Sequence, residues 1–465
     1  MPEEIKIHNS DANRDCRMAL RIAKAVAEAG GRTFYVGGCV RDWISGIDNK
    51  DIDIEIHGVT PEKLALILDS LGKRTQMGSS FGIYGMRGYD IDIAMPRKET
   101  AIGRGHKDFE VYVDPFLGTK KAAVRRDFTM NALMQDVLSG EIVDHFGGVK
   151  DLKAGVLRHV KAETFVEDPL RVLRAAQFAA RFGFKVAEET RELAKTMDLR
   201  PLARERIMEE LKKGLLKSEH PSVFFEEMDA MEQMEVWFPE VKKLQGVEQN
   251  PQHHPEGDVW IHTMMTLDMA ASLRKQAKEP LGLMLAALTH DFGKVSSSKM
   301  VDGKVRSIGH DKEGVAPARS FMKRITNESK LIKYVLNMTA LHMRPLALYT
   351  GKAKNKSYFV LFDKSVEPDD LLLLSKADYN GRKEIEANLD MEACLKEKLE
   401  AYRELMDQPS VMGADLIAAG MRPGPEFSDL LAFAHNLHLS GVNKEDALKQ
   451  TLAYGKKQKI DEKSE

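Results

Sequence analysis

The sequence predicts an α+β protein with several domains, in which a mixed sheet with helices is followed by an all-helical remainder. Segments before residue 100 are β-branched and aromatic, or alternate between charged and apolar residues, as strands do. From residue 161 to residue 217 the apolar residues follow a helical period, and no strand signal is present. At 465 residues the chain is long enough for about two to four domains.

The composition predicts a protein without a global electrostatic field. The hydrophobic fraction of 43% is ample for packed cores, and the net charge is −2. Any nucleic acid must therefore meet a local basic surface. Cys16, Cys39 and Cys394 are too far apart for a zinc motif or a disulfide framework. Because the first residues lack the order of a signal peptide and no apolar run could span a bilayer, we expect a soluble, cytoplasmic protein without a membrane partner.

The first elements are expected to be a helix over residues 12–30, then a strand and a tight turn. Residues 32–36 suit a strand, and Gly37-Gly38 would end it and let the backbone approach a ligand. Residues 39–45 have the composition of a short helix. Its free N–H groups, together with Arg41, are suited to phosphate.

A second strand over residues 50–56 carries the first candidate metal ligands. Charged and apolar residues alternate, so Asp51, Asp53 and Glu55 should share one face while the isoleucines enter a core. Adjacent carboxylates repel each other unless a cation lies between them, and oxygen ligands suit Mg²⁺. An edge strand with a charged solvent face is the alternative, but the preceding GG-x-V-R-D turn favours a site for metal and nucleotide phosphates.

The next segments extend this candidate site. Thr60-Pro61-Glu62 has the pattern of a helix start, residues 81–85 of a short strand, and residues 88–94 of a strand with Asp90 and Asp92 on one face. A third carboxylate on a neighbouring strand is what a two-metal phosphoryl-transfer site needs. A second amphipathic strand without a ligand role is the alternative.

Two further segments are suited to binding substrate. The loop over residues 96–106 is polar and rich in Arg and Lys, and such loops close over substrates. In residues 122–132 the spacing places Asp127 and Asn131 on one helical face, while Arg125 and Arg126 could reach phosphates. A surface salt-bridge cluster is the alternative for this second segment.

Four motifs in order, GGCVRD, KDIDIE, RRDFTMNAL and EDPLRVLRAAQFAARFGF, resemble those of the class II CCA-adding tRNA nucleotidyltransferases. The resemblance implies a polymerase-β-like head in which Asp51 and Asp53 hold Mg²⁺ and Asp92 is a third catalytic carboxylate. It also implies that Gly38, Arg41 and Arg126 contact the phosphates or sugar of the nucleotide. Asp127 and Asn131 complete the implied nucleotide-binding residues of this region.

The motif that begins at Glu167 should open a helix, with Asp168 and Arg171 on one face. A carboxylate beside a guanidinium can present acceptors and donors to the base of C or A; a helix-surface salt bridge is the alternative. In the family the motif is the protein template for CTP and ATP, and Arg174 also contacts nucleotide. This chain departs from its nearest family members at Gln177, where they carry arginine. Residues 204–211 resemble the next motif of the family, a helix that packs behind the pocket. We expect the charged side chains of this helix to have a structural role.

A second constellation, in the C-terminal half, combines His262, a His290-Asp291 pair and Asp378 on or near predicted helices. It resembles the HD metal-dependent phosphohydrolases. That resemblance implies these four residues as metal ligands, with His310 and His342 either completing a metal site or binding phosphate. Mixed imidazole and carboxylate ligands suit Ni²⁺, Mn²⁺, iron or Zn²⁺ better than Mg²⁺.

The domains expected from these resemblances are an N-terminal helix and extension, a head, a helical neck, an HD body and a tail with a charged, disordered end (residues 1–31, 32–158, 159–225, 226–395 and 396–465). The resemblance implies template-independent addition of CCA to tRNA from CTP and ATP, with the acceptor stem along the neck and body. It further implies hydrolysis of 2′,3′-cyclic phosphates, 2′-nucleotides or phosphate esters by the HD site. The oligomeric state is left open.

Three alternatives remain at this stage. The head could serve a narrower enzyme that adds only A or only CC, or a poly(A) polymerase. The protein could act mainly as an HD phosphohydrolase. It could also be an RNA-binding scaffold with an inactive head, although intact carboxylates at each expected position oppose that.

Overall fold

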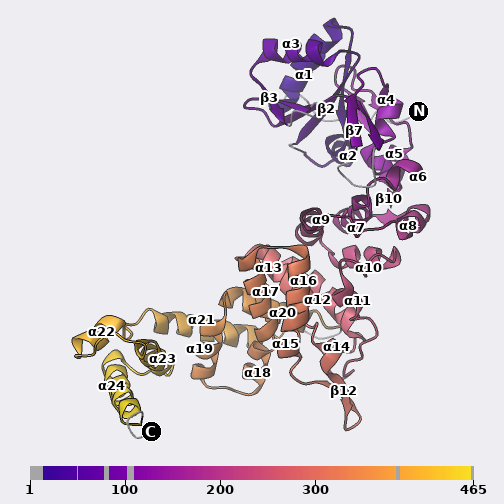
Figure 1. Ribbon diagram of the computed structural model, residues 1–465. Coiled ribbons are helices and arrows are strands. Elements are labelled where there is room, and N and C mark those ends of the chain that lie inside the picture. The colour runs from indigo at the N-terminus through magenta and orange to yellow at the C-terminus, as the bar shows by residue number, and fades with distance from the viewer. Residues whose placement is uncertain (1–13, 50, 78–82, 102–108, 384–387, 462–465) are drawn as a thin grey trace. The chain divides into compact units, whose positions relative to one another are not determined.

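The computed structural model describes residues 14–49, 51–77, 83–101, 109–383 and 388–461, and the chain divides into two compact units (Figure 1). Unit 1 is Met1–Trp237 and unit 2 is Phe238–Glu465. The loop expected over residues 96–106 is wrong in its first part, because Arg97–Ala101 form strand β6, which pairs with β7 (Phe109–Val113). Residues 102–106 of that loop, the start of the 81–85 strand and both chain ends lie outside the described residues. Among those that are described, no helix is long and apolar enough to cross a membrane.

Unit 1 contains the sheet and the first group of helices. Its strands are β1 (Arg32–Val36), β2 (Ile52–His57), β3 (Arg74–Met77), β4 (Ile83–Met86), β5 (Ile91–Ala94), β6 (Arg97–Ala101), β7 (Phe109–Val113), β8 (Met134–Asp136), β9 (Ile142–Val143), β10 (Val156–Leu157) and β11 (Lys185–Val186). Its helices are α1 (Arg14–Glu28), α2 (Gly38–Ile44), α3 (Pro61–Leu71), α4 (Thr119–Ala123), the 3-10 turn η1 (Thr129–Asn131), α5 (Gly148–Ala154), α6 (Ala162–Phe165), α7 (Leu170–Phe182), α8 (Glu188–Lys195), α9 (Arg204–Lys217) and α10 (Ser222–Ala230).

Within the described residues, the main sheet has seven strands in the order β3-β4-β5-β2-β1-β8-β9. Strand β2 lies antiparallel to β1 and parallel to β5, so the sheet is mixed, as predicted. The three isoleucines of β2 are fully or almost fully buried, which confirms the predicted alternation. Helix α1 packs on β1 and α3 through a buried stripe that includes Met18, Ile22 and Val26. Thr60 caps α3 as its sequence indicated.

Two further predictions for this unit need correction. Residues 122–132 do not form one helix: α4 ends at Ala123, Phe128 bridges to His159, and η1 follows. A bridge requires extended backbone, which the helical spacing of Asp127 and Asn131 could not reveal. The neck is also not all-helical, because β10 and β11 form a parallel pair. Buried Phe128 contacts the rings of Phe165 and Phe178, so this segment ties the sheet region to α6 and α7.

Unit 2 is largely helical. Its helices are α11 (Pro239–Lys242), α12 (Val259–Leu273), the 3-10 turn η2 (Arg274–Gln276), α13 (Pro280–Thr289), α14 (Lys294–Ser297), α15 (His310–Glu313), α16 (Val315–Ile325), α17 (Ser329–Leu341), α18 (Arg344–Thr350), α19 (Asn355–Lys364), α20 (Pro368–Asn380), α21 (Leu389–Met406), α22 (Gly413–Ala418), α23 (Phe427–His438) and α24 (Lys444–Asp461). A hairpin of β12 (Ser298–Val301) and β13 (Lys304–Ser307) corrects the prediction of an all-helical body.

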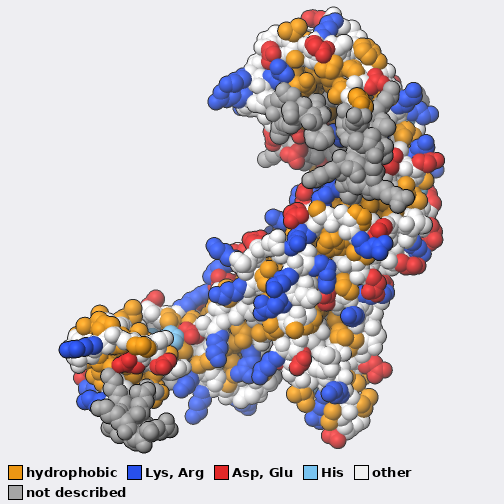
Figure 2. All heavy atoms as spheres, viewed as in Figure 1, with side chains coloured by type: hydrophobic (Ala, Val, Ile, Leu, Met, Phe, Trp, Pro, Cys, Tyr) orange, Lys and Arg blue, Asp and Glu red, His pale blue; other side chains and the backbone are white. Residues whose placement is uncertain are grey.

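Helix α12 packs against α13 and α20, and α13 also packs against α17, so four helices surround one interior. Helices α22, α23 and α24 form a smaller cluster around buried Leu416 and Leu430. In Figure 2 acidic and basic side chains are interspersed over the surface shown, in keeping with the net charge of −2.

Candidate active sites

Two aspartates of unit 1 lie next to each other across parallel strands. Asp53 of β2 and Asp92 of β5 are register partners, so their side chains project from the same face of the sheet. Asp51 directly precedes β2 and shares the face of Asp53. Burial, followed by the negative charges of Asp92 and Asp51, raises the pKa of Asp53 to about 6, although Arg126 opposes the shift. This mutual repulsion fits a site for a divalent cation.

Glu55, the third acid on this face of β2, is already engaged. It lies 2.8 Å from His57 and 3.6 Å from Arg126, and it is almost fully buried. Burial alone would raise the pKa of Glu55, but these partners lower it. Glu55 therefore holds Arg126, while Asp51, Asp53 and Asp92 are the available ligands.

A cavity of about 670 Å³ lies beside the carboxylates. It is lined by the turn after β1, by Asp51 and Asp53, and by residues of α7 and α9. All predicted nucleotide-binding residues line it: Gly38, Arg41, Arg126, Asp127, Asn131, Asp168, Arg171 and Arg174. The structure thus brings the predicted set together from segments more than a hundred positions apart in the chain, from Gly38 to Arg174.

A chain of hydrogen bonds joins opposite walls of this cavity. Arg41 donates to Asn131 (2.7 Å) and Asn131 donates to Asp127 (3.0 Å). Arg174 donates to the other oxygen of Asp127 (2.6 Å). Burial alone would raise the pKa of Asp127, but Arg174 and Asn131 lower it. Because both oxygens of Asp127 are engaged, this carboxylate orients the arginines.

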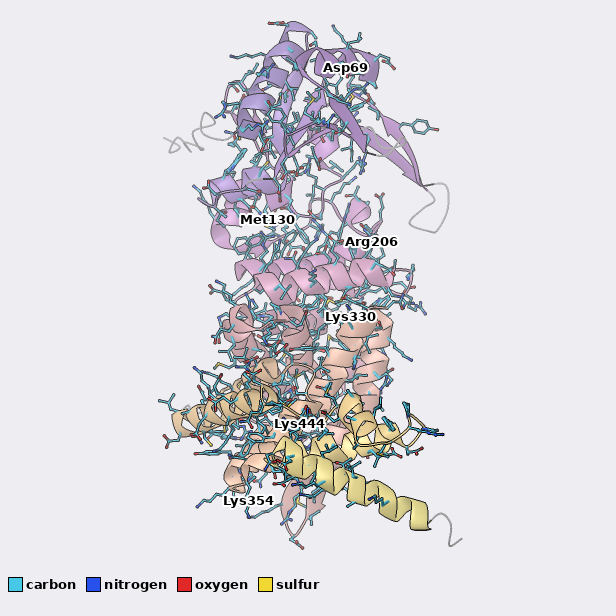
Figure 3. All side chains as sticks on the ribbon, turned by 90° about the vertical axis from the view of Figure 1, so that its left-hand side faces the viewer. Asp69, Met130, Arg206, Lys330, Lys354 and Lys444 are labelled. Carbon is cyan, nitrogen blue, oxygen red and sulfur yellow. The ribbon has the colours of Figure 1, made fainter. Side chains whose placement is uncertain are left out.

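Asp168 and Arg171 both line the cavity, but each is held by another partner. Arg206 of α9 donates to Asp168 (3.0 Å), and Arg171 donates to the backbone carbonyls of Arg125 (2.6 Å) and Thr164. Arg206, labelled in Figure 3, lines the cavity itself, whereas the sequence placed its helix behind the pocket. The i, i+7 and i+11 spacing of Arg206, Lys213 and Lys217 was the signal for this basic face.

Gln177 also lines the cavity, and its side-chain nitrogen is buried without a hydrogen-bond partner among the described residues. Helix α7 presents it between Arg174 and Arg181, which line the same cavity. Where an arginine would add charge, this chain offers a neutral carboxamide.

The second site lies in the helical interior of unit 2, where four predicted ligands meet. The Nε2 atom of His262 in α12 lies 3.1 Å from Asp378 in α20 and 3.7 Å from Asp291 after α13. His290 Nε2 lies 3.2 Å from Asp291. All four side chains are buried. Burial alone would raise the pKa of Asp291, but the neighbouring His290 and Lys294 hold it well below its usual value.

His310 and His342 lie on the other side of Asp291. Its Oδ1 atom is 3.3 Å from His310 Nε2 and 3.8 Å from His342 Nε2, while its Oδ2 atom faces His262 and His290. The two oxygens of one carboxylate thus face two separate imidazole pairs. This is an arrangement that could bridge two metal ions.

The orientation of the imidazoles supports metal binding. His290, His310 and His342 each place Nδ1 2.7 Å from a backbone carbonyl, of Ala287, Ser307 and Thr339 respectively. In the neutral tautomer with the proton on Nδ1, the Nε2 atom of each ring has a lone pair that a metal ion beside Asp291 could use. His290 Nε2 is buried without a hydrogen-bond partner among the described residues, and Asp291 Oδ2 has none there besides its ion-pair contact with Lys294 (2.7 Å). A set of imidazoles and carboxylates with such unsatisfied atoms fits a transition metal.

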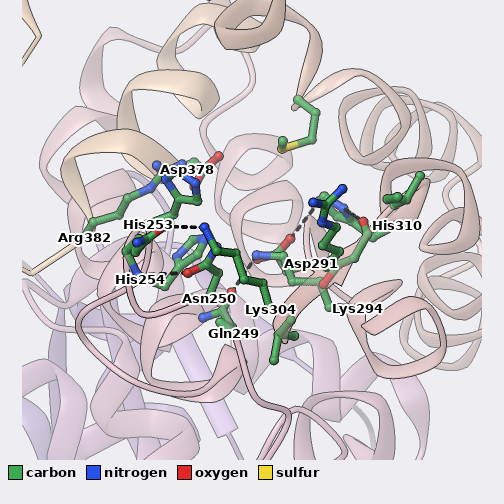
Figure 4. A pocket seen from close by; sticks show the side chains of 16 residues that line it. Gln249, Asn250, His253, His254, Asp291, Lys294, Lys304, His310, Asp378 and Arg382 are labelled. Carbon is green, nitrogen blue, oxygen red and sulfur yellow. Dashed lines mark hydrogen bonds and ion pairs between the residues drawn. The ribbon is translucent and has the colours of Figure 1, made fainter. Parts of the chain in front are cut away.

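A cavity of about 480 Å³ opens onto this cluster (Figure 4). Asp291, His310 and Asp378 line it together with Lys294, whose ammonium contacts Asp291 (2.7 Å) and Gln249 (2.6 Å). Lys304 and Arg306 of the hairpin and Arg382, which follows α20, add positive charge. The sequence did not identify Lys304 and Arg306 as part of the site, because β12 and β13 were not predicted.

Comparisons with known proteins identify the domains that contain the two candidate sites. Residues 33–158 match the poly A polymerase head domain, residues 183–244 the family described as "probable RNA and SrmB-binding site of polymerase A", and residues 259–380 the HD domain. The fold is similar to that of the Thermotoga maritima CCA-adding enzyme complexed with tRNA (TM-score 0.62, 21% identity, 94% of this chain and 95% of that chain). A CCA-adding enzyme with ATP gives a TM-score of 0.66 at 20% identity, covering 95% and 94% of the two chains.

These folds and sites define a tRNA nucleotidyltransferase carrying an HD domain. The multifunctional CCA protein of Nitrosomonas europaea is 42% identical over 63% of this chain and 69% of the relative. That of Nitrosomonas eutropha is 40% identical over 76% of this chain and 84% of the relative. The chain belongs to the family of multifunctional CCA proteins, which join CCA addition to HD-domain hydrolysis.

Proposed function

We propose that the unit 1 cavity binds CTP and ATP and passes their nucleotidyl groups to the 3′ end of tRNA. The observation that carries this proposal is the pairing of Asp53 with Asp92, which repel each other beside an arginine-lined cavity. Asp51, Asp53 and Asp92 would hold Mg²⁺. When bound, Mg²⁺ supplies activation of the terminal 3′-hydroxyl and charge balance for the pyrophosphate.

The remaining residues of the cavity position the nucleotide. Arg126, held by Glu55, is placed to contact phosphate, as are the backbone at Gly38 and the guanidinium of Arg41. Asp127 holds Arg174 toward the same space. We assign base selection to Asp168 and Arg171, with Arg206 orienting the Asp168 carboxylate.

In unit 2 the proposed reaction is hydrolysis of phosphate esters of the RNA-end type: 2′,3′-cyclic phosphates and 2′-phosphates. His262, His290, Asp291 and Asp378 would hold one ion such as Ni²⁺ or Mn²⁺, and Asp291, His310 and His342 a second. Such ions supply Lewis acidity and a hydrolytic nucleophile at neutral pH. Lys304, Arg306 and Arg382 are placed to neutralise the ester phosphate. A tRNA substrate favours a cytoplasmic enzyme.

The test of the unit 1 proposal uses Mg²⁺ and tRNA transcripts that end before CCA, at the first C, or at CC. Each receives CTP, ATP or both, and product lengths are read on a sequencing gel. We expect two C residues with CTP and a single A with ATP. Growth of the CC-ended transcript alone would show an A-adding enzyme, growth that stops at CC a CC-adding enzyme, and a ladder of A residues a poly(A) polymerase.

The test of the unit 2 proposal uses 2′,3′-cyclic AMP and 2′-AMP with protein stripped by chelator and reloaded with Ni²⁺ or Mn²⁺. We expect hydrolysis only after reloading. Equal hydrolysis by the stripped protein would contradict a metal-dependent site.

A further inference from the structure

A buried glutamate next to the HD cluster has no role in the sites described so far. Glu256 lies in the loop before α12, and its side chain is fully buried. One of its oxygens, Oε1, lies 2.8 Å from Nδ1 of His262 and 2.9 Å from Nδ1 of His254. Its other oxygen, Oε2, has no hydrogen-bond partner among the described residues. A buried carboxylate in this state needs a physical reason.

The geometry at His262 gives that reason. Its Nε2 atom faces the carboxylates of Asp378 (3.1 Å) and Asp291 (3.7 Å), so a metal ion held by those carboxylates would need the lone pair of Nε2. Neutral imidazole carries one proton, so with Nε2 on a metal ion that proton must be on Nδ1, 2.8 Å from Glu256 Oε1, a contact that lacks the alignment of a formed hydrogen bond. The other histidines of the cluster direct Nδ1 to backbone carbonyls. His262 alone among the cluster histidines directs Nδ1 to a carboxylate.

The same oxygen also holds His254, which lines the cavity. The rings of His254 and His262 meet edge to face, 4.6 Å apart. Gly257 allows the chain to turn between Glu256 and the α12 cap Asp258, because its φ of 125° is strained for other residues. The loop is thus built to direct Glu256 inward.

We propose that Glu256 is a positioning residue of the HD centre that fixes His262 in the Nδ1–H tautomer and raises its basicity as a metal ligand. The inference rests on the proposed HD metal centre. A rival interpretation makes His254, Glu256 and His262 the ligands of an additional ion, since their ligand atoms lie within 4.8 Å of one another. That would require His262 to bind metal through both nitrogens.

The experiment titrates the stripped full-length protein with Ni²⁺ by calorimetry, in excess Mg²⁺ so that the carboxylates of unit 1 are occupied. The variants are Glu256→Ala, Glu256→Gln and the control Glu248→Gln, which removes an exposed acid of the same loop. We expect Glu256→Ala to bind Ni²⁺ about 10- to 100-fold more weakly with unchanged stoichiometry. Glu256→Gln should retain part of the affinity, because its carbonyl still accepts from Nδ1, and the control should match the wild type.

Three results would overturn the inference. Unchanged Ni²⁺ affinity in both Glu256 variants would remove the positioning role. Loss of one bound ion, with the affinity for the remainder unchanged, would make Glu256 a ligand. Failure of the wild type to bind Ni²⁺ would remove the proposed centre itself, and this is distinguishable from the other two. If Glu256→Ala does not fold, as judged by circular dichroism, the isosteric Glu256→Gln decides.

Discussion

The two sites of this protein use carboxylates in opposite environments. In unit 1, Asp51 and Asp92 are exposed and Asp53 is half-buried, so their mutual repulsion is only partly screened. In unit 2, Asp291 and Asp378 are buried among imidazoles, which stabilise their negative charge although burial alone would raise their pKa values. The exposed carboxylates of unit 1 are therefore suited to a hydrated ion that arrives and leaves with the substrate phosphates. The buried carboxylates of unit 2 are suited to ions that stay bound.

The largest effect is expected from neutralising Asp53, the central aspartate of the unit 1 carboxylates. Asp53→Asn should lower nucleotide addition on the order of 10³-fold, because metal stabilisation of the transition state contributes several kcal/mol. Initial rates on a CC-ended transcript measure it. Asp69→Asn is the control, since Asp69 pairs with Arg74 on the surface and does not line the cavity. Retention of most activity by Asp53→Asn would refute the metal assignment.

The next largest effect is expected at Asp127, which joins Arg174 and Asn131 in the hydrogen-bond chain beside these carboxylates. Asp127→Ala leaves Arg174 without its carboxylate partner and Asn131 without its acceptor. Loss of one member of a buried pair costs about 3–5 kcal/mol of stability. We expect a lower denaturant midpoint and a kcat/KM for CTP and ATP reduced by roughly two orders of magnitude. A variant as active as the wild type would show that Arg174 needs no positioning.

Asp53 should also make the free energy of unfolding depend on pH. In the metal-free protein the charged Asp53 lowers stability, whereas with Mg²⁺ bound it raises stability. Its folded pKa of about 6 exceeds the unfolded value of 3.8. The folded state therefore binds more protons in that window, and stability falls as pH rises from about 4 to 6. Without Mg²⁺ at pH 7.5, Asp53→Asn should be more stable by roughly 2 kcal/mol. Urea unfolding measures this, and added Mg²⁺ should stabilise only the wild type.

The smallest predicted effect lies at the rim of the buried site. Lys304→Ala with Arg306→Ala removes two hairpin cations that line the cavity but not the metal cluster. The KM for 2′,3′-cyclic AMP should rise about 3- to 10-fold with a smaller change in kcat, because exposed ion pairs contribute at most about 1 kcal/mol each. Lys330→Ala, an exposed lysine on α17, is the matched control. An unchanged KM would place the phosphate elsewhere.

A local period in the sequence predicted part of the unit 1 site, and motifs in the sequence predicted part of the unit 2 site. The alternation in residues 50–56 identified Asp51 and Asp53, and the register of β2 with β5 places Asp92 beside them. The four proposed HD ligands were predicted from the resemblance, and the helices of unit 2 bring their side chains together. In each case a short-range pattern or motif in the sequence was enough to predict which residues lie in the site.

The parts that sequence did not predict depend on distant pairing. Arg206 meets Asp168 from 38 positions away, and Arg171 reaches the carbonyl of Arg125 from 46. Glu256 has no periodic signal, since its role follows from the direction of a loop. The hairpin β12–β13 was missed because Ser, Lys and Gly in residues 296–304 gave no clear alternation.

The most direct test of two independent centres measures both activities in one set of proteins: the wild type, Asp53→Asn and Asp291→Asn. Nucleotide addition is followed on a CC-ended transcript with ATP, and hydrolysis on 2′,3′-cyclic AMP with Ni²⁺. The account predicts that Asp53→Asn loses addition and keeps hydrolysis, and that Asp291→Asn does the reverse. If either substitution abolished both activities in a folded protein, the assignment of one reaction to each unit would be contradicted.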